Sequence, residues 1–238
     1  PISPARSFTS TAVSTSDGPD GGPEQPAIEA LETLIAKQPN EVQAYVLLSS
    51  AYLAKGEPLK ATDAARKIVT LVPKDPRGPY LVGIGLRRQG KTAEARQQFE
   101  ASLALAPEFL EPLAQLASLA FAEKKPDAAL ERIKQQIARV PKSAALHHVL
   151  GGAHVARREA EQAEAAYLKA LELNPNLAVT YVALGQLYFT SGKYSQALAR
   201  LQDGLKVNPK DLTAHMLSGA IYERLGDIPK ARQVYERA

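Results

Sequence analysis

The sequence predicts an all-α fold, a solenoid of antiparallel helix pairs, and two series of residues carry this prediction. Prolines recur every 34 residues, at Pro39, Pro73, Pro107, Pro141, Pro175 and Pro209. Alanines keep the same step, at Ala27, Ala61, Ala95, Ala129, Ala163, Ala197 and Ala231. Apolar residues between these markers follow the helical period. A fixed period of about 20 to 50 residues is typical of repeat proteins, and one of about 34 indicates a helix–turn–helix unit.

Composition excludes several other classes of protein. The chain has 238 residues, of which 45% are hydrophobic, enough to bury the core of one large domain or two ordinary ones. It contains no Cys, which excludes disulfide frameworks and thiolate metal sites. Its net charge is only +4 and its charges are interleaved, so we expect no nucleic-acid partner. No apolar run approaches the roughly 18 to 20 residues that span a bilayer, so we expect no direct membrane insertion.

Residues 1–23 differ from the rest of the chain. They are dominated by Ser, Thr, Pro and Gly, lack apolar periodicity, and are interpreted as a tail or linker. A start at Pro1 rather than Met suggests a processed form that could have lost a signal peptide or lipid anchor.

The remaining chain divides into repeats when each proline is counted as position 32. A half-repeat helix is predicted over residues 24–41, and six repeats over residues 42–238, beginning at residues 42, 76, 110, 144, 178 and 212, the last incomplete. Position 20 is always Ala, and position 8 is always small: Ser49, Gly83, Ala117, Gly151, Gly185 and Gly219. Small residues are expected where two helices cross closely.

Turns and caps are predicted between the helices. Gly56, Gly90, Gly192 and Gly226 stand where a left-handed residue can end a first helix. Lys124 and Arg158 replace this glycine, which predicts a different turn geometry or strain. The residues placed to cap the next helices are Asn40, Asp75, Ser143, Asn176 and Asp211. Proline and glycine near Pro76 predict that the repeat starting there begins late and is the least regular.

The repeat that starts at residue 178 carries the pattern most fully. Its marker residues are Tyr181, Leu184, Gly185, Tyr188, Ala197, Leu201, Gly204 and Pro209. With these residues the chain resembles the tetratricopeptide repeat family from about residue 24 to residue 238. The resemblance implies a right-handed superhelix whose first helices line a concave groove. Its "LELNPN" and "LKVNPK" linkers are similar to those of bacterial envelope-assembly and polysaccharide-export members. The compartment is unknown, with the periplasm or an anchored location slightly favoured over the cytoplasm.

In this family, positions 2, 5, 6, 9, 12 and 13 point into the groove. The predicted groove residues are Val46, Leu47, Ser50, Leu53, Arg77, Tyr80, Leu81, Ile84, Arg87, Arg88, Ala114, Gln115, Ser118, Phe121, His148, Val149, Gly152, Val155, Val182, Ala183, Gln186, Phe189, Met216, Leu217, Glu223 and Arg224. This surface is mainly apolar, so the resemblance implies a protein or peptide partner with an apolar segment. The family's clamp for chaperone tails and its asparagine ladder for sugar transfer are both missing.

Three of the protein's histidines gather in "ALHHVLGGAHV", a spacing that a metal site could use. The repeat register favours another interpretation. His147 and His215 occupy position 4 and His154 occupies position 11, where other repeats carry tyrosine rings. Only His148, at position 5, is expected to face the groove.

No catalytic motif is present, and we expect no enzyme activity, no cofactor and no metal. The first functional hypothesis is a non-catalytic scaffold that binds a partner in the groove. One alternative is a partner-recruiting or regulatory segment of a larger enzyme such as a transferase. Another is self-assembly through the final helix, which has no cap, or through the N-terminal tail.

Overall fold

The computed structural model describes residue 22 and residues 24–237, and every regular element in these residues is an α-helix. The helices are α1 (Gln25–Lys37), α2 (Val42–Lys55), α3 (Pro58–Leu71), α4 (Arg77–Arg88), α5 (Thr92–Leu105), α6 (Leu110–Ala122), α7 (Pro126–Arg139), α8 (Ala144–Ala156), α9 (Ala160–Leu173), α10 (Ala178–Thr190), α11 (Tyr194–Val207), α12 (Leu212–Arg224) and α13 (Ile228–Tyr235). The predicted tail, residues 1–23, lies outside the described residues except for Gly22.

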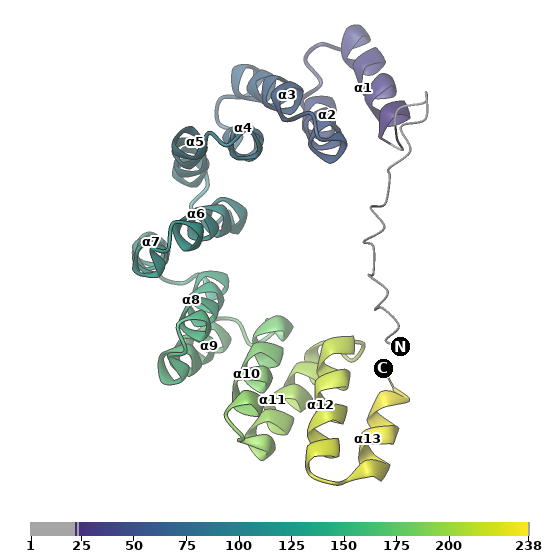
Figure 1. The fold of residues 1–238 in the computed structure, drawn as a ribbon, viewed down its shortest axis with the longest axis vertical. Helices are drawn as coiled ribbons and strands as arrows, with labels where there is room; N and C mark the ends of the chain where they lie inside the picture. Colours follow the sequence, from purple (N-terminus) through teal and green to yellow (C-terminus); the bar gives the residue numbers. More distant parts are fainter. Residues whose placement is uncertain (1–21, 23, 238) are drawn as a thin grey trace, which may run out of the picture.

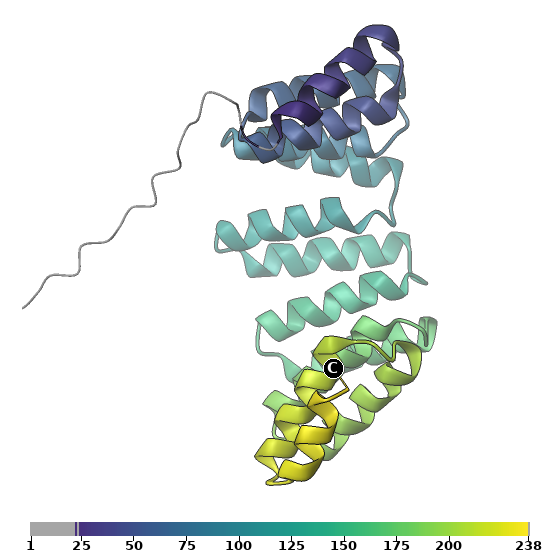
Figure 2. The same ribbon diagram turned by 90° about the vertical axis from the view of Figure 1, so that its right-hand side faces the viewer.

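The helices form a curved stack. Along the upper part of the arc the first helices α2, α4 and α6 lie on the inner, concave side, and the second helices α3, α5 and α7 lie outside them (Figure 1). Seen at right angles, the pairs lie across the long axis, one above another (Figure 2). This architecture confirms the predicted all-α solenoid of helix pairs.

The recurring prolines end the second helices. In all six cases the helix stops two residues before the proline, at Lys37, Leu71, Leu105, Arg139, Leu173 and Val207. The residue between leaves the helical region, with ψ between 69° and 94°. Steric conflict with the proline ring disfavours helical backbone in the preceding residue, so the proline series sets the length of every repeat.

Four helix pairs cross where position 8 of the first helix, a glycine, meets position 24 of the second. A Cβ added to Gly185 would lie only 2.7 Å from Leu201 Cδ2. The same contact joins Gly83 to Phe99, Gly151 to Tyr167 and Gly219 to Tyr235, where the added atom would lie 2.5, 2.4 and 2.2 Å from a ring carbon. Glycine on one helix is therefore matched by a large side chain on the other, which brings the helix axes close together.

The turn glycines adopt the predicted left-handed backbone, with φ of 80°, 77°, 73° and 77° at Gly56, Gly90, Gly192 and Gly226. Lys124 and Arg158 adopt the same backbone, with φ of 59° and 62°. The expectation of a different geometry at these two turns is therefore wrong, and that of strain holds, because a Cβ makes left-handed backbone unfavourable.

Two of the predicted caps hold. The side chains of Ser143 and Asp211 accept backbone N–H groups from Leu146 and Ala214, at 3.4 and 3.0 Å. The prediction for Asp75 is wrong, because the N-cap of α4 is Pro76, which makes no side-chain cap; Asp75 accepts the Arg77 N–H at 2.9 Å from just outside the cap position.

The predictions for Asn40 and Asn176 are wrong. Glu41 caps α2, accepting the Gln43 N–H at 3.2 Å. The N-cap of α10 is Leu177, which makes no side-chain cap. In both places the helix begins one residue later than the asparagine would require, so the asparagine lies outside the cap position.

The glycines and prolines of α4 delay its start but do not interrupt the helix. It begins one residue late, at Arg77, as expected, and has 12 residues. Gly78 and Gly85 do not disorder it. A Cβ on Gly78 would lie 3.0 Å from Val69, and one on Gly85 would overlap Thr62, so both glycines let α3 and α4 pack closely.

Ala27 departs from the alanine series. The other six alanines are buried, with at most 2% exposure, whereas Ala27 is exposed. Within the described residues no first helix precedes α1, so the face of α1 that carries Ala27 has no helix to cross.

We predict that Lys124→Gly and Arg158→Gly each stabilise the protein. Removing the Cβ relieves roughly 1 kcal/mol of left-handed strain, and the greater freedom of glycine in the unfolded chain offsets about half of that. The melting temperature should rise by about 2 °C per site. Gly192→Lys is the reverse change and should lower it. Thermal unfolding followed by circular dichroism measures all three, and a lower melting temperature for both glycine variants would contradict the prediction.

Candidate functional site

The structure sorts the predicted groove residues by accessibility. Exposed residues are Leu47, Ser50, Arg77, Arg87, Arg88, Ala114, Phe121, Gly152, Val155, Gln186, Met216, Glu223 and Arg224. Half-buried residues are Val46, Leu53, Tyr80, Ile84, Gln115, Ser118, His148, Val149, Val182, Ala183 and Phe189. Leu81 is only 8% exposed and belongs to the apolar core. Leu217, at 9%, is also a core residue.

Three apolar side chains at position 12 form what we call the inner stripe: Phe121, Val155 and Phe189, near the C-terminal ends of α6, α8 and α10. Phe121 is 41% exposed and Val155 is 43% exposed, while Phe189 is half-buried against the Tyr194 ring at 5.9 Å. Apolar groups this exposed on consecutive repeats form a continuous surface that a partner could cover.

The floor beside the inner stripe is made of small side chains. Ala114 and Gly152 are exposed, and Ser118 is half-buried. A Cβ on Gly152 would touch only the Tyr167 hydroxyl, at 3.8 Å, so this part of α8 is open to solvent rather than tightly covered. Small residues here let a bound segment approach the backbone of α6 and α8 closely.

Val179 was not among the predicted groove residues, although it occupies position 2 and is 52% exposed on α10. Counting along the repeat is enough to place Val179 at a groove position, so the sequence alone could have identified it. It adds another apolar contact at the opposite end of α10 from Phe189.

The basic residues of the concave side fall into two kinds. Arg77 is held by Asp75, with Nη2 2.7 Å from Oδ2, and donates to Gln43 at 3.1 Å. The guanidinium hydrogen bond lowers the pKa of the Asp75 carboxyl. Arg87 contacts only the neutral amide of Gln115, and neither Arg87 nor Arg88 has an ion pair among the described residues. These two arginines therefore keep their charge available.

His148 is packed between repeats. Its Nδ1 lies 2.9 Å from the Thr180 hydroxyl, and its ring lies against Tyr167, with centroids 5.4 Å apart. Burial lowers the pKa of the imidazole. His148 thus links α8 to α10, and its direct contact with a partner stays a prediction.

The other histidines have structural partners. His147 and His215 bond through Nε2 to the carbonyl oxygens of Pro141 and Pro209, at 3.3 and 2.9 Å. Tyr45, at the same repeat position, donates to the Pro39 carbonyl at 3.0 Å. These rings share one role, which is to hold the loop that enters each first helix.

His154 is a buried residue of α8, with Nδ1 2.7 Å from Glu159 Oε2. Among the described residues, no group of three or more His, Cys, Asp or Glu side chains could hold a metal ion.

This architecture is that of a helical-repeat solenoid with an accessible inner surface. Three family models described as tetratricopeptide repeat match the chain, at residues 26–76 and 182–238, 86–153, and 144–177. The chain belongs to the tetratricopeptide repeat family.

Two curated relatives show the family resemblance over long stretches. Anaphase-promoting complex subunit 3 of Schizosaccharomyces pombe is 24% identical over 212 residues, which is 89% of this chain and 32% of the relative. BBSome complex member BBS4 of Bos taurus is 24% identical over 152 residues, 64% of this chain and 29% of the relative. The chain thus spans about a third of the length of these relatives.

Solved structures share the fold. MamA is 24% identical with a TM-score of 0.53, covering 66% of this chain and 91% of that one. PilF of Pseudomonas aeruginosa is 17% identical with a TM-score of 0.57, covering 81% and 88%. None of the helices in the described part of the chain is long and apolar enough to cross a membrane.

We predict that His148 makes the protein less stable in mild acid. Its pKa is lowered in the folded state by burial, so below the ordinary value of 6.5 the unfolded chain takes up a proton that the folded protein resists. The free energy of unfolding should therefore decrease as the pH falls through 6.5, with no contribution from this group well above that value.

Urea unfolding of the wild type and His148→Gln at several pH values measures this effect. The glutamine variant should lose part of the dependence, whereas Thr180→Val, which leaves the ring buried, should keep it. Identical pH profiles for wild type and His148→Gln would contradict the assignment.

Proposed function

We propose that the protein is a non-catalytic scaffold that holds a partner protein or peptide on its concave side. The observation that carries the proposal is the inner stripe, because Phe121 and Val155 are 41% and 43% exposed on a surface that the solenoid itself does not cover. Burying such side chains releases roughly 25 cal/mol per Å² of apolar surface, which favours a partner with an apolar segment.

The chemistry of the described residues supports a binding role over catalysis. Most carboxylates on the outer helices are engaged in ion pairs, such as Glu172 with Lys169 at 2.6 Å and Asp203 with Lys206 at 2.9 Å. The curated relatives are named as members of multiprotein complexes. Both features support a scaffold role.

A second candidate function is a partner-recruiting segment of a larger protein, an enzyme such as a transferase included. What favours it is that the chain spans only about a third of its curated relatives. The full-length sequence tests it, because a strand–helix alternation outside these residues would indicate a catalytic domain.

Self-association is the third candidate, and exposed apolar residues at the last helix pair favour it. Leu225 and Ile228 are 51% and 61% exposed at the turn between α12 and α13. Light scattering across concentration, with Ile228→Ser as the variant, tests it. A mass that stays at one chain would remove this candidate.

For the scaffold, we predict that Val155→Asp lowers partner capture by about tenfold, because a charge at a buried interface centre is desolvated without a counterion. The matched control is Leu168→Asp on the outer helix α9, since Leu168 and Val155 are both 43% exposed. Quantitative affinity capture from the native source compares the two. Proteins that bind the wild type should be lost only from the Val155 variant, and equal loss from both variants would contradict the groove.

A further inference from the structure

We propose that the segment held on the concave side carries acidic residues beside its apolar ones, and that these carboxylates pair with a cationic edge. This edge consists of Arg87, Arg88, Lys91, Lys124 and Arg158. The proposal rests on the scaffold function and adds the chemistry of the partner.

All five residues of the cationic edge are exposed and lack an ion pair among the described residues. The lack of an ion pair distinguishes them from neighbouring cations. Arg96 pairs with Glu123 at 2.7 Å, and Arg132 pairs with Glu100 at 2.7 Å. In contrast, Arg87 meets only the neutral Gln115 amide. An incoming carboxylate therefore gains a cation at this edge without displacing a carboxylate already bound.

The cationic edge runs beside the inner stripe. Lys124 follows Phe121 by three residues and Arg158 follows Val155 by three, each on the turn that ends the stripe helix. Arg87 itself occupies position 12 on α4, the position that Phe121 and Val155 hold on α6 and α8. Apolar and cationic groups thus alternate along the same edge of three successive repeats, which fits a segment with both kinds of side chain.

Backbone strain supports this interpretation independently. Four of the turns use glycine at the left-handed position, whereas Lys124 and Arg158 hold φ at 59° and 62°. Glycine would remove this strain, so the two cations are kept at a stability cost. Strained residues of this kind concentrate at functional sites. These two strained cations belong to the same two repeats that carry Phe121 and Val155.

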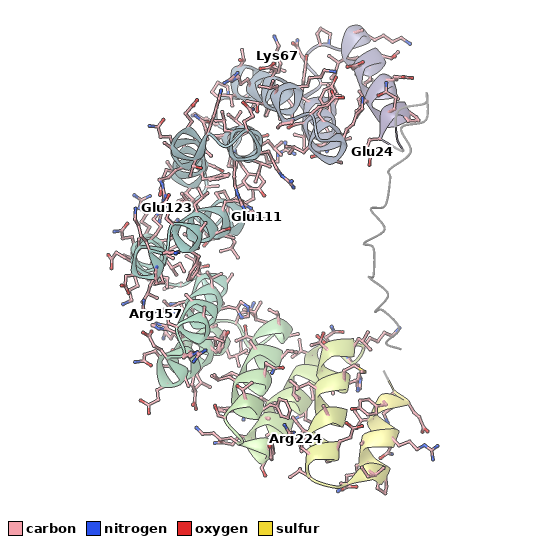
Figure 3. The ribbon with its side chains drawn as sticks, viewed as in Figure 1. Glu24, Lys67, Glu111, Glu123, Arg157 and Arg224 are labelled. Carbon is pink, nitrogen blue, oxygen red and sulfur yellow. The ribbon has the colours of Figure 1, made fainter. Side chains whose placement is uncertain are left out.

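An acidic polypeptide fits this surface better than a nucleic acid. A phosphate backbone needs a long basic surface, whereas the inner side of α6 also carries Glu111 (Figure 3). The net charge of the chain is only +4, and its basic and acidic residues are interleaved. Carboxylates spaced among apolar side chains match both features of the edge.

The first test is a peptide-display selection on the whole protein, using a random library of 16-residue peptides. Enriched peptides should carry at least two Asp or Glu residues next to apolar ones. Enrichment of neutral apolar or basic peptides, or no enrichment, overturns the proposal. A single-stranded RNA oligomer added as competitor should not displace the peptides, and tight RNA binding at this edge would likewise overturn it.

The second test measures the affinity of one enriched peptide for variants. Arg87→Gln combined with Arg88→Gln should weaken binding by about tenfold at low salt, and by less at high salt, because exposed charge pairs are screened. Lys67→Gln is the control, since Lys67 is an exposed cation on the outer side of α3 (Figure 3). Equal affinities for the double variant and the control would overturn the cationic edge.

The third test separates the strained residues from simple charge. Lys124→Gly combined with Arg158→Gly should weaken the same peptide by about threefold while the melting temperature rises. If Val155→Asp lowers the affinity of the peptide and substitution of the five cations does not, the scaffold function is supported and the acidic partner is contradicted. If Val155→Asp also leaves the affinity unchanged, binding in the groove is contradicted.

Discussion

The contact between a glycine of the first helix and a large side chain of the second helix, made in four of the six pairs, is the constraint on which the rest of the solenoid depends. Gly151 against Tyr167 and Gly185 against Leu201 leave no room for a Cβ, so the two helices cross at one fixed point. Fixing the crossing also fixes which residues of the first helix face outward. Position 12 lies four residues after position 8, about one helical turn on, so it has the same relation to the crossing in every repeat. The inner stripe therefore recurs with the crossing.

Contacts between successive helix pairs fix how each pair packs on the next. At three of the six repeat prolines, the carbonyl that follows the second helix is held by a ring of the next first helix: Tyr45 with Pro39, His147 with Pro141 and His215 with Pro209. His148 adds a second link by joining Thr180 on α10 and Tyr167 on α9. It lies where one apolar cluster, ending at α8, gives way to the next, beginning at α9. Polar contacts thus continue the packing where the apolar core is divided.

The sequence predicts those features that repeat and misses those that depend on a single interface. The proline step, the small crossing residues and the left-handed turns follow from a local rule that each repeat obeys by itself. The burial of Leu81 could not be inferred this way, because Leu47, at the same repeat position, is 48% exposed. Leu81 is covered because it belongs to the apolar cluster that also contains Ile68 and Val82. Asn40 and Asn176 were misplaced because the start of a helix moved by one residue.

Departures from the repeat are where a solenoid can acquire specificity. Each repeat contacts only its neighbours, so a substitution changes the local surface while the rest of the stack is unaffected. Residues that every repeat shares therefore explain the fold and say little about the partner. Lys124 and Arg158 are informative because they depart from glycine at a position where glycine is physically favoured, and Arg87 because it replaces an apolar residue of the stripe. We infer the chemistry of the partner from these exceptions, which lie on a surface that the regular residues position.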